Sequence, residues 1–285
     1  MSRSVAFILP HMDVGAIRID PIVDGVISMP AVDMLQRPGL PDAWDAHRDL
    51  LTPDGMLEMP VGGFLVRTDE RVVLVDAGLG PMDRDAYRAG RLLSSLLEIG
   101  IQPDDVTDVL LTHLHFDHVG WVTQKGVIVF PSATYRCHGD DWQHFVVSPG
   151  AESGAIRKLS PLEPRLELFA GDCTIAPGID VRTAPGHTPG SAIVVISSGL
   201  ARAMLIGDVV HCPIELTEPD WEMAFDVDPQ LAARTREALA RELEDGEVPA
   251  AAAHFPGLQF GRLLSGEGGR RWTYGWGRQS GGART

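Results

Sequence analysis

Residues 113–118, with the sequence HLHFDH, hold three histidines and one aspartate within six positions. Neutral imidazole is the commonest protein ligand for zinc and similar ions, and a string of this kind is rare by chance. In an extended or turn segment His113 and His115 point the same way, while Asp117 and His118 are turned aside. One segment can therefore serve two neighbouring metal sites, and the missing ligands must come from elsewhere in the chain.

Further candidate ligands follow apolar runs in the second half of the chain. His187 lies in the tight turn APGHTPG, Asp208 follows the run that ends in Ile206-Gly207, and His254 follows a run of four alanines. The apolar run Val106–Thr112 likewise predicts a buried strand that ends directly before His113. Loops at strand ends gather to form sites, so we expect these side chains to meet.

The remaining pattern alternates strands with helices. Strands are predicted over Val14–Asp20 and Ile22–Ser28, and leucines spaced for one buried face predict a helix over Arg84–Ile99. Asp228 followed by proline predicts a helix start, with the helix running to about Glu244. Residues 30–60 lack periodicity and predict a long loop, which includes Met34, Leu35 and Trp44 and could cover the site.

The length and net charge of the chain limit the classes of function that it can have. The 285 residues carry a formal net charge of −15, which disfavours nucleic acids and anionic membranes as partners. We expect one domain over residues 1–274, built of two similar β-rich halves, and a flexible tail over residues 275–285. The three cysteines have no CxxC spacing, and the N-terminal apolar run is too short for a secretory signal, so the expected location is the cytoplasm.

Five motifs, in the order VDAGLG, LLTHLHFDHVGW, APGHTPGS, LIGDVV and AAAHFPG, resemble the metallo-β-lactamase-fold hydrolases. The resemblance extends from about residue 61 to residue 260. It implies an α/β fold, a four-layer αβ/βα sandwich with the site at its edge, and a supporting role for Asp76. The implied ligands of two metals fall into three sets: His113, His115 and His187 for the first ion, Asp117, His118 and His254 for the second, and Asp208 bridging both.

Within that family the chain looks most like the quorum-quenching lactonases and the methyl-parathion-hydrolase-like branch. Lactonases carry a tyrosine three residues after the bridging aspartate, where this chain has His211, which is either a surrogate donor or a packing residue. The expected activity is opening of a lactone or carboxylic ester by a metal-bridging hydroxide, with Asp117, Asp208 and His211 as candidate catalytic residues. Asp208 would pass a proton to the leaving alkoxide.

Three alternatives remain open at this stage: an aryl phosphotriesterase, a glyoxalase II-like thioesterase, and a protein that binds metal without catalysis. The ligand set implies two divalent ions per chain, with zinc first and iron, manganese or cobalt also compatible. The expected partners are a small uncharged substrate and a second copy of the chain in a homodimer, with no nucleic acid and no membrane.

Overall fold

The structure, a computed structural model, describes residues 10–275. Its larger sheet has nine strands, in the order β12-β11-β8-β5-β4-β2-β7-β6, with β1 paired to β2. These strands are β1 (Met12–Val14), β2 (Ile17–Pro30), β4 (Met56–Arg67), β5 (Val72–Val75), β6 (Met82–Arg84), β7 (Tyr87–Ala89), β8 (Asp108–Leu110), β11 (Thr134–His138) and β12 (Leu166–Phe169).

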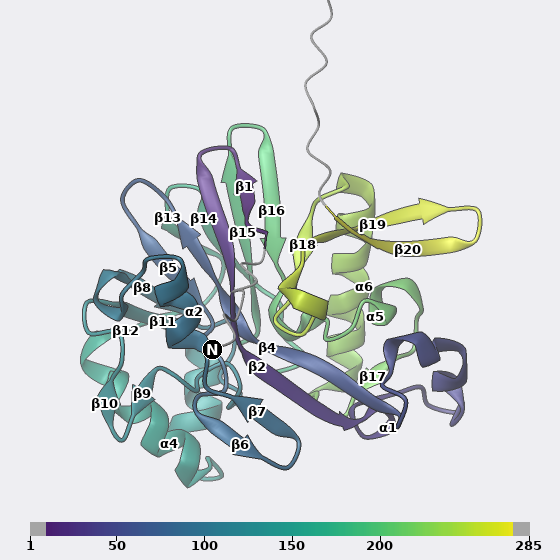
Figure 1. The fold of residues 1–285 in the computed structure, drawn as a ribbon, viewed down its shortest axis with the longest axis horizontal. Coiled ribbons are helices and arrows are strands. Elements are labelled where there is room, and N and C mark those ends of the chain that lie inside the picture. Colours follow the sequence, from purple (N-terminus) through teal and green to yellow (C-terminus); the bar gives the residue numbers. More distant parts are fainter. Residues whose placement is uncertain (1–9, 276–285) are drawn as a thin grey trace, which may run out of the picture.

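A second sheet of seven strands faces the first and has the order β13-β14-β15-β16-β18-β19-β20 (Figure 1). Its strands are β13 (Cys173–Ala176), β14 (Ile179–Thr183), β15 (Ala192–Ser198), β16 (Ala201–Leu205), β18 (Ala250–Ala251), β19 (Gly261–Gly266) and β20 (Gly269–Tyr274). Two small pairs complete the strands: β9 (Thr123–Gln124) with β10 (Val127–Ile128), and β3 (Leu35–Gln36) with β17 (Glu222–Met223).

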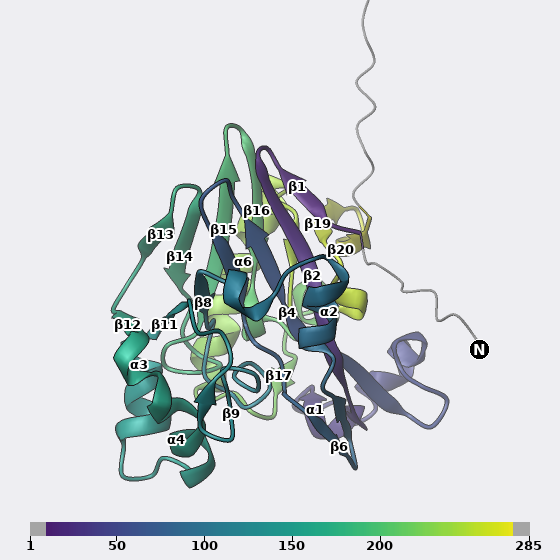
Figure 2. The same cartoon turned by 60° about the vertical axis from the view of Figure 1, so that its left-hand side comes forward.

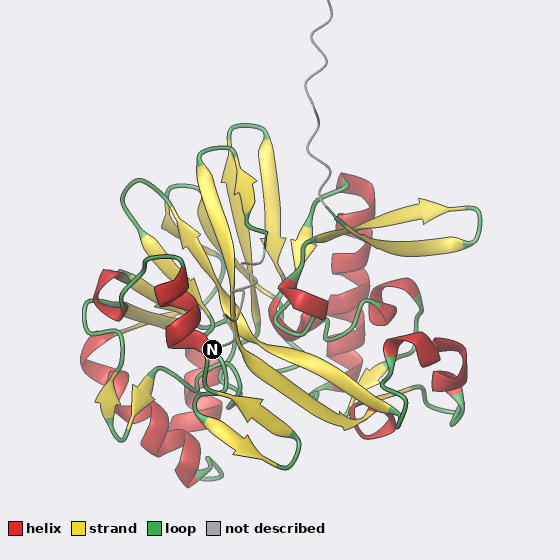
Figure 3. Cartoon of the chain, viewed as in Figure 1, coloured by secondary structure: helices red, strands yellow, loops and turns green. Residues whose placement is uncertain are grey.

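Helices lie outside both sheets, which Figure 3 shows in red against the yellow strands. The α-helices are α1 (Ala31–Met34), α2 (Leu92–Glu98), α3 (Gly139–Trp142), α4 (Ser153–Leu159), α5 (Ile214–Thr217) and α6 (Pro229–Gly246). The short turns of 3₁₀ or π type are η1 (Ala43–Leu50), η2 (Pro103–Asp105), η3 (Gln143–Val147), η4 (Ser160–Arg165), η5 (Gly207–Val209) and η6 (Pro256–Leu258). None of the helices within residues 10–275 is long and apolar enough to cross a membrane.

Alternation along the strands explains the layers. In β15, Val194 and Ile196 pack into the core between the two sheets, whereas Ile193 and Val195 pack toward α6. Successive side chains of a strand point to opposite faces, so a strand buried on both faces is apolar throughout. The side chains of β4 divide in the same way, between the central core and the core under α2. The result is the expected four-layer αβ/βα sandwich.

The bounds of three predicted elements differ in the structure. The predicted strands 14–20 and 22–28 are confirmed as strand, but they are largely one strand, β2, because antiparallel pairing with β4 runs from Arg18 to Pro30 past Pro21. The predicted helix 84–99 begins only at Leu92, because residues 82–89 form the β6–β7 hairpin and β7 pairs with β2. The carboxylate of Asp24 accepts hydrogen bonds from the backbone N–H of Gly90 and Leu92, where the chain turns into α2.

The predicted helix start at Asp228 is confirmed, since its carboxylate accepts a hydrogen bond from Leu231 N at the start of α6. The predicted loop 30–60 is shorter and less irregular than expected, because β2 and β4 extend into it and α1, β3 and η1 lie between them. Figure 2 shows α1 at the same end of the molecule as β6 and β17. Apart from Gly275, the predicted flexible tail lies outside the described residues.

Candidate metal centre

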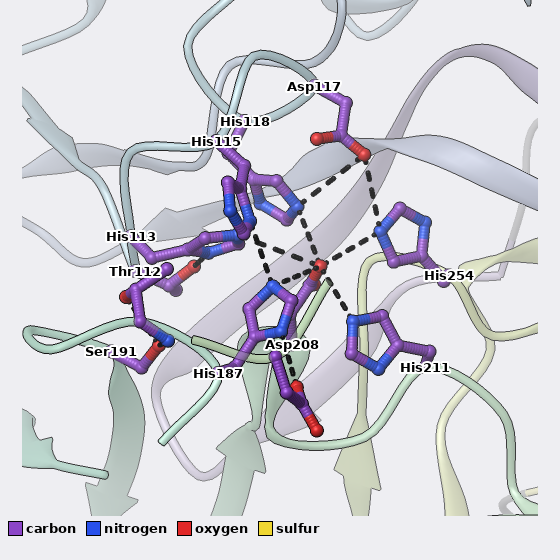
Figure 4. Close-up of polar contacts among 12 residues, drawn as sticks. Thr112, His113, His115, Asp117, His118, His187, Ser191, Asp208, His211 and His254 are labelled. Carbon is purple, nitrogen blue, oxygen red and sulfur yellow. Dashed lines mark hydrogen bonds and ion pairs between the residues drawn. The ribbon is translucent and has the colours of Figure 1, made fainter. Parts of the chain in front are cut away.

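The candidate ligands come from four loops that leave the two sheets at one edge. Residues 112–118 follow β8, His187 follows β14, Asp208 follows β16 and His254 follows β18. The expectation that these loops meet is confirmed (Figure 4). Ala192 N donates to Thr112 O at 2.9 Å, which joins the loop of the first sheet to β15 of the second.

Asp208 lies at the centre of this cluster (Figure 4). Its Oδ2 is surrounded by the Nε2 atoms of five histidines, at 3.1 Å from His254, 3.2 Å from His118, 3.3 Å from His211, and 3.7 Å from both His113 and His187. Asp117 Oδ2 is 3.5 Å from His254 Nε2 and 4.0 Å from His118 Nε2. His115 Nδ1 is 2.9 Å from His187 Nε2.

These atoms fall into four groups whose members all lie within 4.8 Å of one another and could hold a metal ion. The groups are His113, His115 and His187; His113, His118 and Asp208; Asp117, His118 and His254; and His187, Asp208 and His211. A tetrahedral zinc site with Zn–N distances of about 2.0–2.1 Å separates its ligand nitrogens by roughly 3.3 Å. The spacing of the side chains therefore fits two ions, as the family resemblance implies.

Unsatisfied polar atoms support this fit. His113 Nε2, His118 Nε2 and Asp208 Oδ1 are buried and have no hydrogen-bond partner among the described residues. Burial, with the neighbouring His118, lowers the pKa of His113 well below its ordinary value. Burial and the adjacent His187 lower the pKa of His115 to about 3. His113 and His115 are therefore neutral at neutral pH, which is the form in which an imidazole binds a divalent ion.

Asp76 fixes the ring of His118 and the start of the 112–118 loop. Its carboxylate accepts hydrogen bonds from Thr112 N and Thr112 Oγ1, both at 2.8 Å, and its Oδ2 lies 3.0 Å from His118 Nδ1. Asp76 adopts a φ of 61°, which few residues other than glycine adopt. The geometry thus gives Asp76 the supporting position that the sequence motif VDAGLG implied.

Asp141 is a supporting residue that the sequence analysis missed. Its side chain is buried in α3 and accepts hydrogen bonds from Leu114 N at 3.0 Å, Thr188 Oγ1 at 3.0 Å and Gly190 N at 2.6 Å. One carboxylate therefore joins the loop of His113 and His115 to the loop of His187. The local sequence GDDW contains no feature that would have identified it.

Asp226, Arg236 and Glu215 were missed as well. Asp226 Oδ1 lies 2.8 Å from His187 Nδ1, and Glu215 Oε2 accepts hydrogen bonds from the backbone N–H of His211 and Cys212. Arg236 contacts both carboxylates. Burial raises the pKa of Asp226 to about 6, so this carboxyl group is ionised at neutral pH.

A cavity of about 120 Å³ opens beside the candidate ligands. His211 lines it together with His115, Asp117, His187, Asp208 and His254. The rest of the wall is apolar or aromatic and consists of Ile27, Met29, Met34, Met59, Tyr87, Phe116, Met223 and Phe225. Of the three residues named in the 30–60 segment, Met34 lines the cavity, while Leu35 and Trp44 pack with it in the core below α1.

Comparisons with known proteins identify one family. Residues 61–254, more than half of the chain, match the family described as the metallo-beta-lactamase superfamily. An N-acyl homoserine lactonase of Bacillus sp is 26% identical over 173 residues, or 55% of this chain and 66% of that protein. The N-acyl homoserine lactonase of Bacillus thuringiensis is 25% identical over 218 residues, or 67% of this chain and 81% of that protein.

Among solved structures, AidC, a dizinc quorum-quenching lactonase in complex with a product, superimposes with a TM-score of 0.85 at 25% identity. The match covers 94% of this chain and 97% of AidC. The family match over residues 61–254 and the similarity in fold are both consistent with the cluster of candidate ligands on four loops. The chain therefore belongs to the metallo-beta-lactamase superfamily of metal-dependent hydrolases.

Proposed function

We propose that the protein is a dinuclear metal-dependent hydrolase that opens a lactone or carboxylic ester. The observation that carries this proposal is the cluster of seven candidate ligand side chains, with Asp208 at its centre, at the base of a largely apolar cavity. The resemblance to N-acyl homoserine lactonases and to a dizinc lactonase supports it. Zinc is the metal that we propose first, because the donors are mainly imidazole nitrogens.

The proposed ligands divide as the sequence motifs imply. His113, His115 and His187 would hold one ion, Asp117, His118 and His254 would hold the other, and Asp208 would contact both. When bound, two ions of this kind acidify a water molecule and polarise a carbonyl oxygen. Burial raises the pKa of Asp208, but the surrounding imidazoles, His118 first, bring it well below the ordinary value. Asp208 therefore stays a carboxylate. A carboxylate with so low a pKa is better suited to binding metal than to passing a proton to the leaving alkoxide.

His211 is the better candidate for moving a proton to the leaving oxygen. Its ring lines the cavity, and its Nε2 is 3.3 Å from Asp208 Oδ2. The ring stacks on His254 with 9° between the planes, which holds Nε2 toward the cavity. Of the two roles left open by the sequence, this geometry supports that of a donor. Asp117, which also lines the cavity, would orient the water that attacks the substrate.

The cavity wall supports a substrate without charge. Within residues 10–275, neither lysine nor arginine is among the residues that line it. A glutathione thioester carries carboxylates that such a wall would leave unpaired, which disfavours the thioesterase alternative. The methionine side chains of the wall are flexible and adapt to apolar groups of varied shape.

Metal analysis and a substrate panel test the proposal together. We expect about two ions per chain by elemental analysis and the highest kcat/KM on an acyl-homoserine lactone, an aryl lactone or an aryl carboxylic ester. The panel includes an aryl phosphotriester and a glutathione thioester. His115→Ala should abolish turnover, while the matched variant His11→Ala, which alters an exposed histidine outside the cluster, should not. Full activity in metal-free protein, or turnover only of the phosphotriester, would contradict the proposal.

Three further expectations stand as proposals. Residues 1–274 form one domain, which the core shared by the two sheets supports. The chain acts in the cytoplasm. It forms a homodimer with a second copy of itself. Light scattering coupled to gel filtration measures the mass directly, and a monomer at micromolar concentration would contradict the dimer.

A further inference from the structure

A row of three buried charged side chains connects His187 to His211 behind the candidate metal centre. Its members are Asp226, Arg236 and Glu215. Asp226 contributes the first link, with Oδ1 at 2.8 Å from His187 Nδ1. The backbone holds the two residues together, because Val227 N donates to His187 O and Asp228 N donates to Gly186 O, both at 3.0 Å. The side chain of Asp226 is only 2% exposed.

Arg236 on α6 is the second member of this row. Its Nη2 is 3.6 Å from Asp226 Oδ2, and its Nη1 makes a short hydrogen bond to Glu215 Oε1. Glu215 Oε2 in turn accepts hydrogen bonds from His211 N at 2.6 Å and Cys212 N at 2.9 Å. The side chains of Arg236 and Glu215 are 6% and 0% exposed. Three buried charges thus connect two histidines of the cavity through α5 and α6.

The tautomer of His187 follows from this arrangement. An ionised carboxylate only accepts hydrogen bonds, so Nδ1 of His187 carries the proton and donates it to Asp226. Nε2 then keeps its lone pair, and this atom lies 2.9 Å from His115 Nδ1 and 3.7 Å from Asp208 Oδ2. A ligand imidazole whose other nitrogen donates to a carboxylate has a fixed ring orientation and a more basic donor atom.

Burying three charges is costly unless each one has a partner. Here Arg236 lies between two carboxylates, and each carboxylate has a second contact that faces the metal centre. Replacing these residues with apolar side chains would be an alternative way to stabilise the fold. The charges are placed where they orient His187 and the backbone of His211, which a role in packing alone does not require.

We infer that Asp226 is a positioning residue for metal binding: it holds His187 in the ligand orientation, and Arg236 with Glu215 holds Asp226 in place. This inference rests on the proposed function, because it takes His187 to be a metal ligand. It concerns residues outside the motifs that mark the family in this chain. It predicts that metal affinity depends on a carboxylate that does not itself reach the ion.

Zinc affinity, measured by competition with a chromogenic chelator, tests the inference on the full chain. Asp226→Ala should weaken zinc binding by about 10- to 100-fold. Asp226→Asn should weaken it less, because its amide oxygen still accepts the Nδ1–H of His187. The matched control is Asp108→Asn, which removes an equally buried carboxylate that pairs with Arg136 at the opposite end of β8. We expect that control to change affinity by no more than about twofold.

The visible spectrum of cobalt-loaded protein gives a second measurement. Its band positions report ligand geometry, so they should shift in Asp226→Ala and stay unchanged in Asp108→Asn. If Asp226→Ala does not fold, Asp226→Asn decides, and an affinity and spectrum equal to those of Asp108→Asn overturn the inference. If the unaltered protein takes up neither zinc nor cobalt, the proposed function fails and this inference fails with it. If the unaltered protein binds metal and Asp226 variants bind it equally well, only the inference fails.

Discussion

Replacing Asp141 by alanine tests how the two loops that bear His115 and His187 are held together. The carboxylate of Asp141 accepts two backbone N–H donors, Leu114 N and Gly190 N, which lie on different loops. Both donors are buried, and the side chain that they share is inaccessible to solvent. The alanine variant therefore removes an acceptor from each loop at once.

The loss of stability can be worked out from these contacts. A buried donor without an acceptor costs about 1–3 kcal/mol, so two of them cost roughly 2–6 kcal/mol. The hydroxyl of Thr188 is spared, because it keeps a contact of 2.7 Å with Ser191 Oγ. Burial raises the pKa of Asp141, which shows that the carboxylate is itself costly to bury, and removing it recovers part of the loss. We expect the free energy of unfolding to fall by about 2–4 kcal/mol.

Urea unfolding of the metal-free protein provides the assay, with the midpoint compared at an unchanged slope. Asp140→Ala is the matched control, because Asp140 is the neighbouring residue and its side chain is 71% exposed. That control should change stability by no more than about 0.5 kcal/mol. Asp141→Asn, which keeps one acceptor oxygen, should fall between the two. An Asp141→Ala protein as stable as Asp140→Ala would refute the reasoning.

Three other predictions address the metal and the thiols. Removing metal with a chelator should lower the Tm, and zinc at about 100 times its Kd should restore roughly 2.7 kcal/mol of stability; an unchanged Tm would contradict the metal site. Burial lowers the pKa of His118, but the carboxylates around it, Asp208 first, raise it well above the ordinary value, so metal uptake must displace a proton there. Zinc affinity from chelator competition should therefore rise with pH, and a flat profile between about pH 6 and 8 would argue against this. Ellman's reagent should label Cys173 in the folded protein and all three cysteines in denaturant, because burial raises the pKa of Cys137 and raises that of Cys212 to about 11. Rapid labelling of Cys137 in the folded protein would contradict that burial.

The candidate ligands could be predicted because their pattern is local. Each one lies directly after an apolar run or within a few residues of it, and β8, β16 and β18 end within two residues of the ends of those runs. The apolar residues of β15 face both the central core and α6, so this strand too is apolar over most of its length. Where burial on two faces and a strand end coincide, the sequence alone determines which side chains reach the edge of the sandwich.

The wrong helix over 84–99 shows the opposite case. The leucine spacing does form a helix over α2. Residues 87–89, however, pair with β2, which lies about 60 positions earlier in the chain. Tyr87 is opposite Ile27, Arg88 opposite Val26 and Ala89 opposite Gly25. Asp24 adds hydrogen bonds to Gly90 N and Leu92 N that no local pattern reveals. Tertiary pairing of this kind overrides the helical spacing of a short segment.

Asp141 and Asp226 were missed for the same physical reason, whereas the motif VDAGLG already implied a supporting role for Asp76. The contacts behind the histidine rings explain how the site is held. The rings of His118, His187 and His254 each present Nε2 to the centre while Nδ1 contacts an oxygen atom. Those oxygens belong to Asp76, Asp226 and the backbone of Pro60, which lie 42, 39 and 194 positions away from the rings that they contact. Spacing within a motif cannot encode the contacts of Asp226 and Pro60, because each joins segments that meet only in the folded chain. Metal affinity in this protein should therefore depend on substitutions far from HLHFDH in the sequence, provided that they move one of these oxygens.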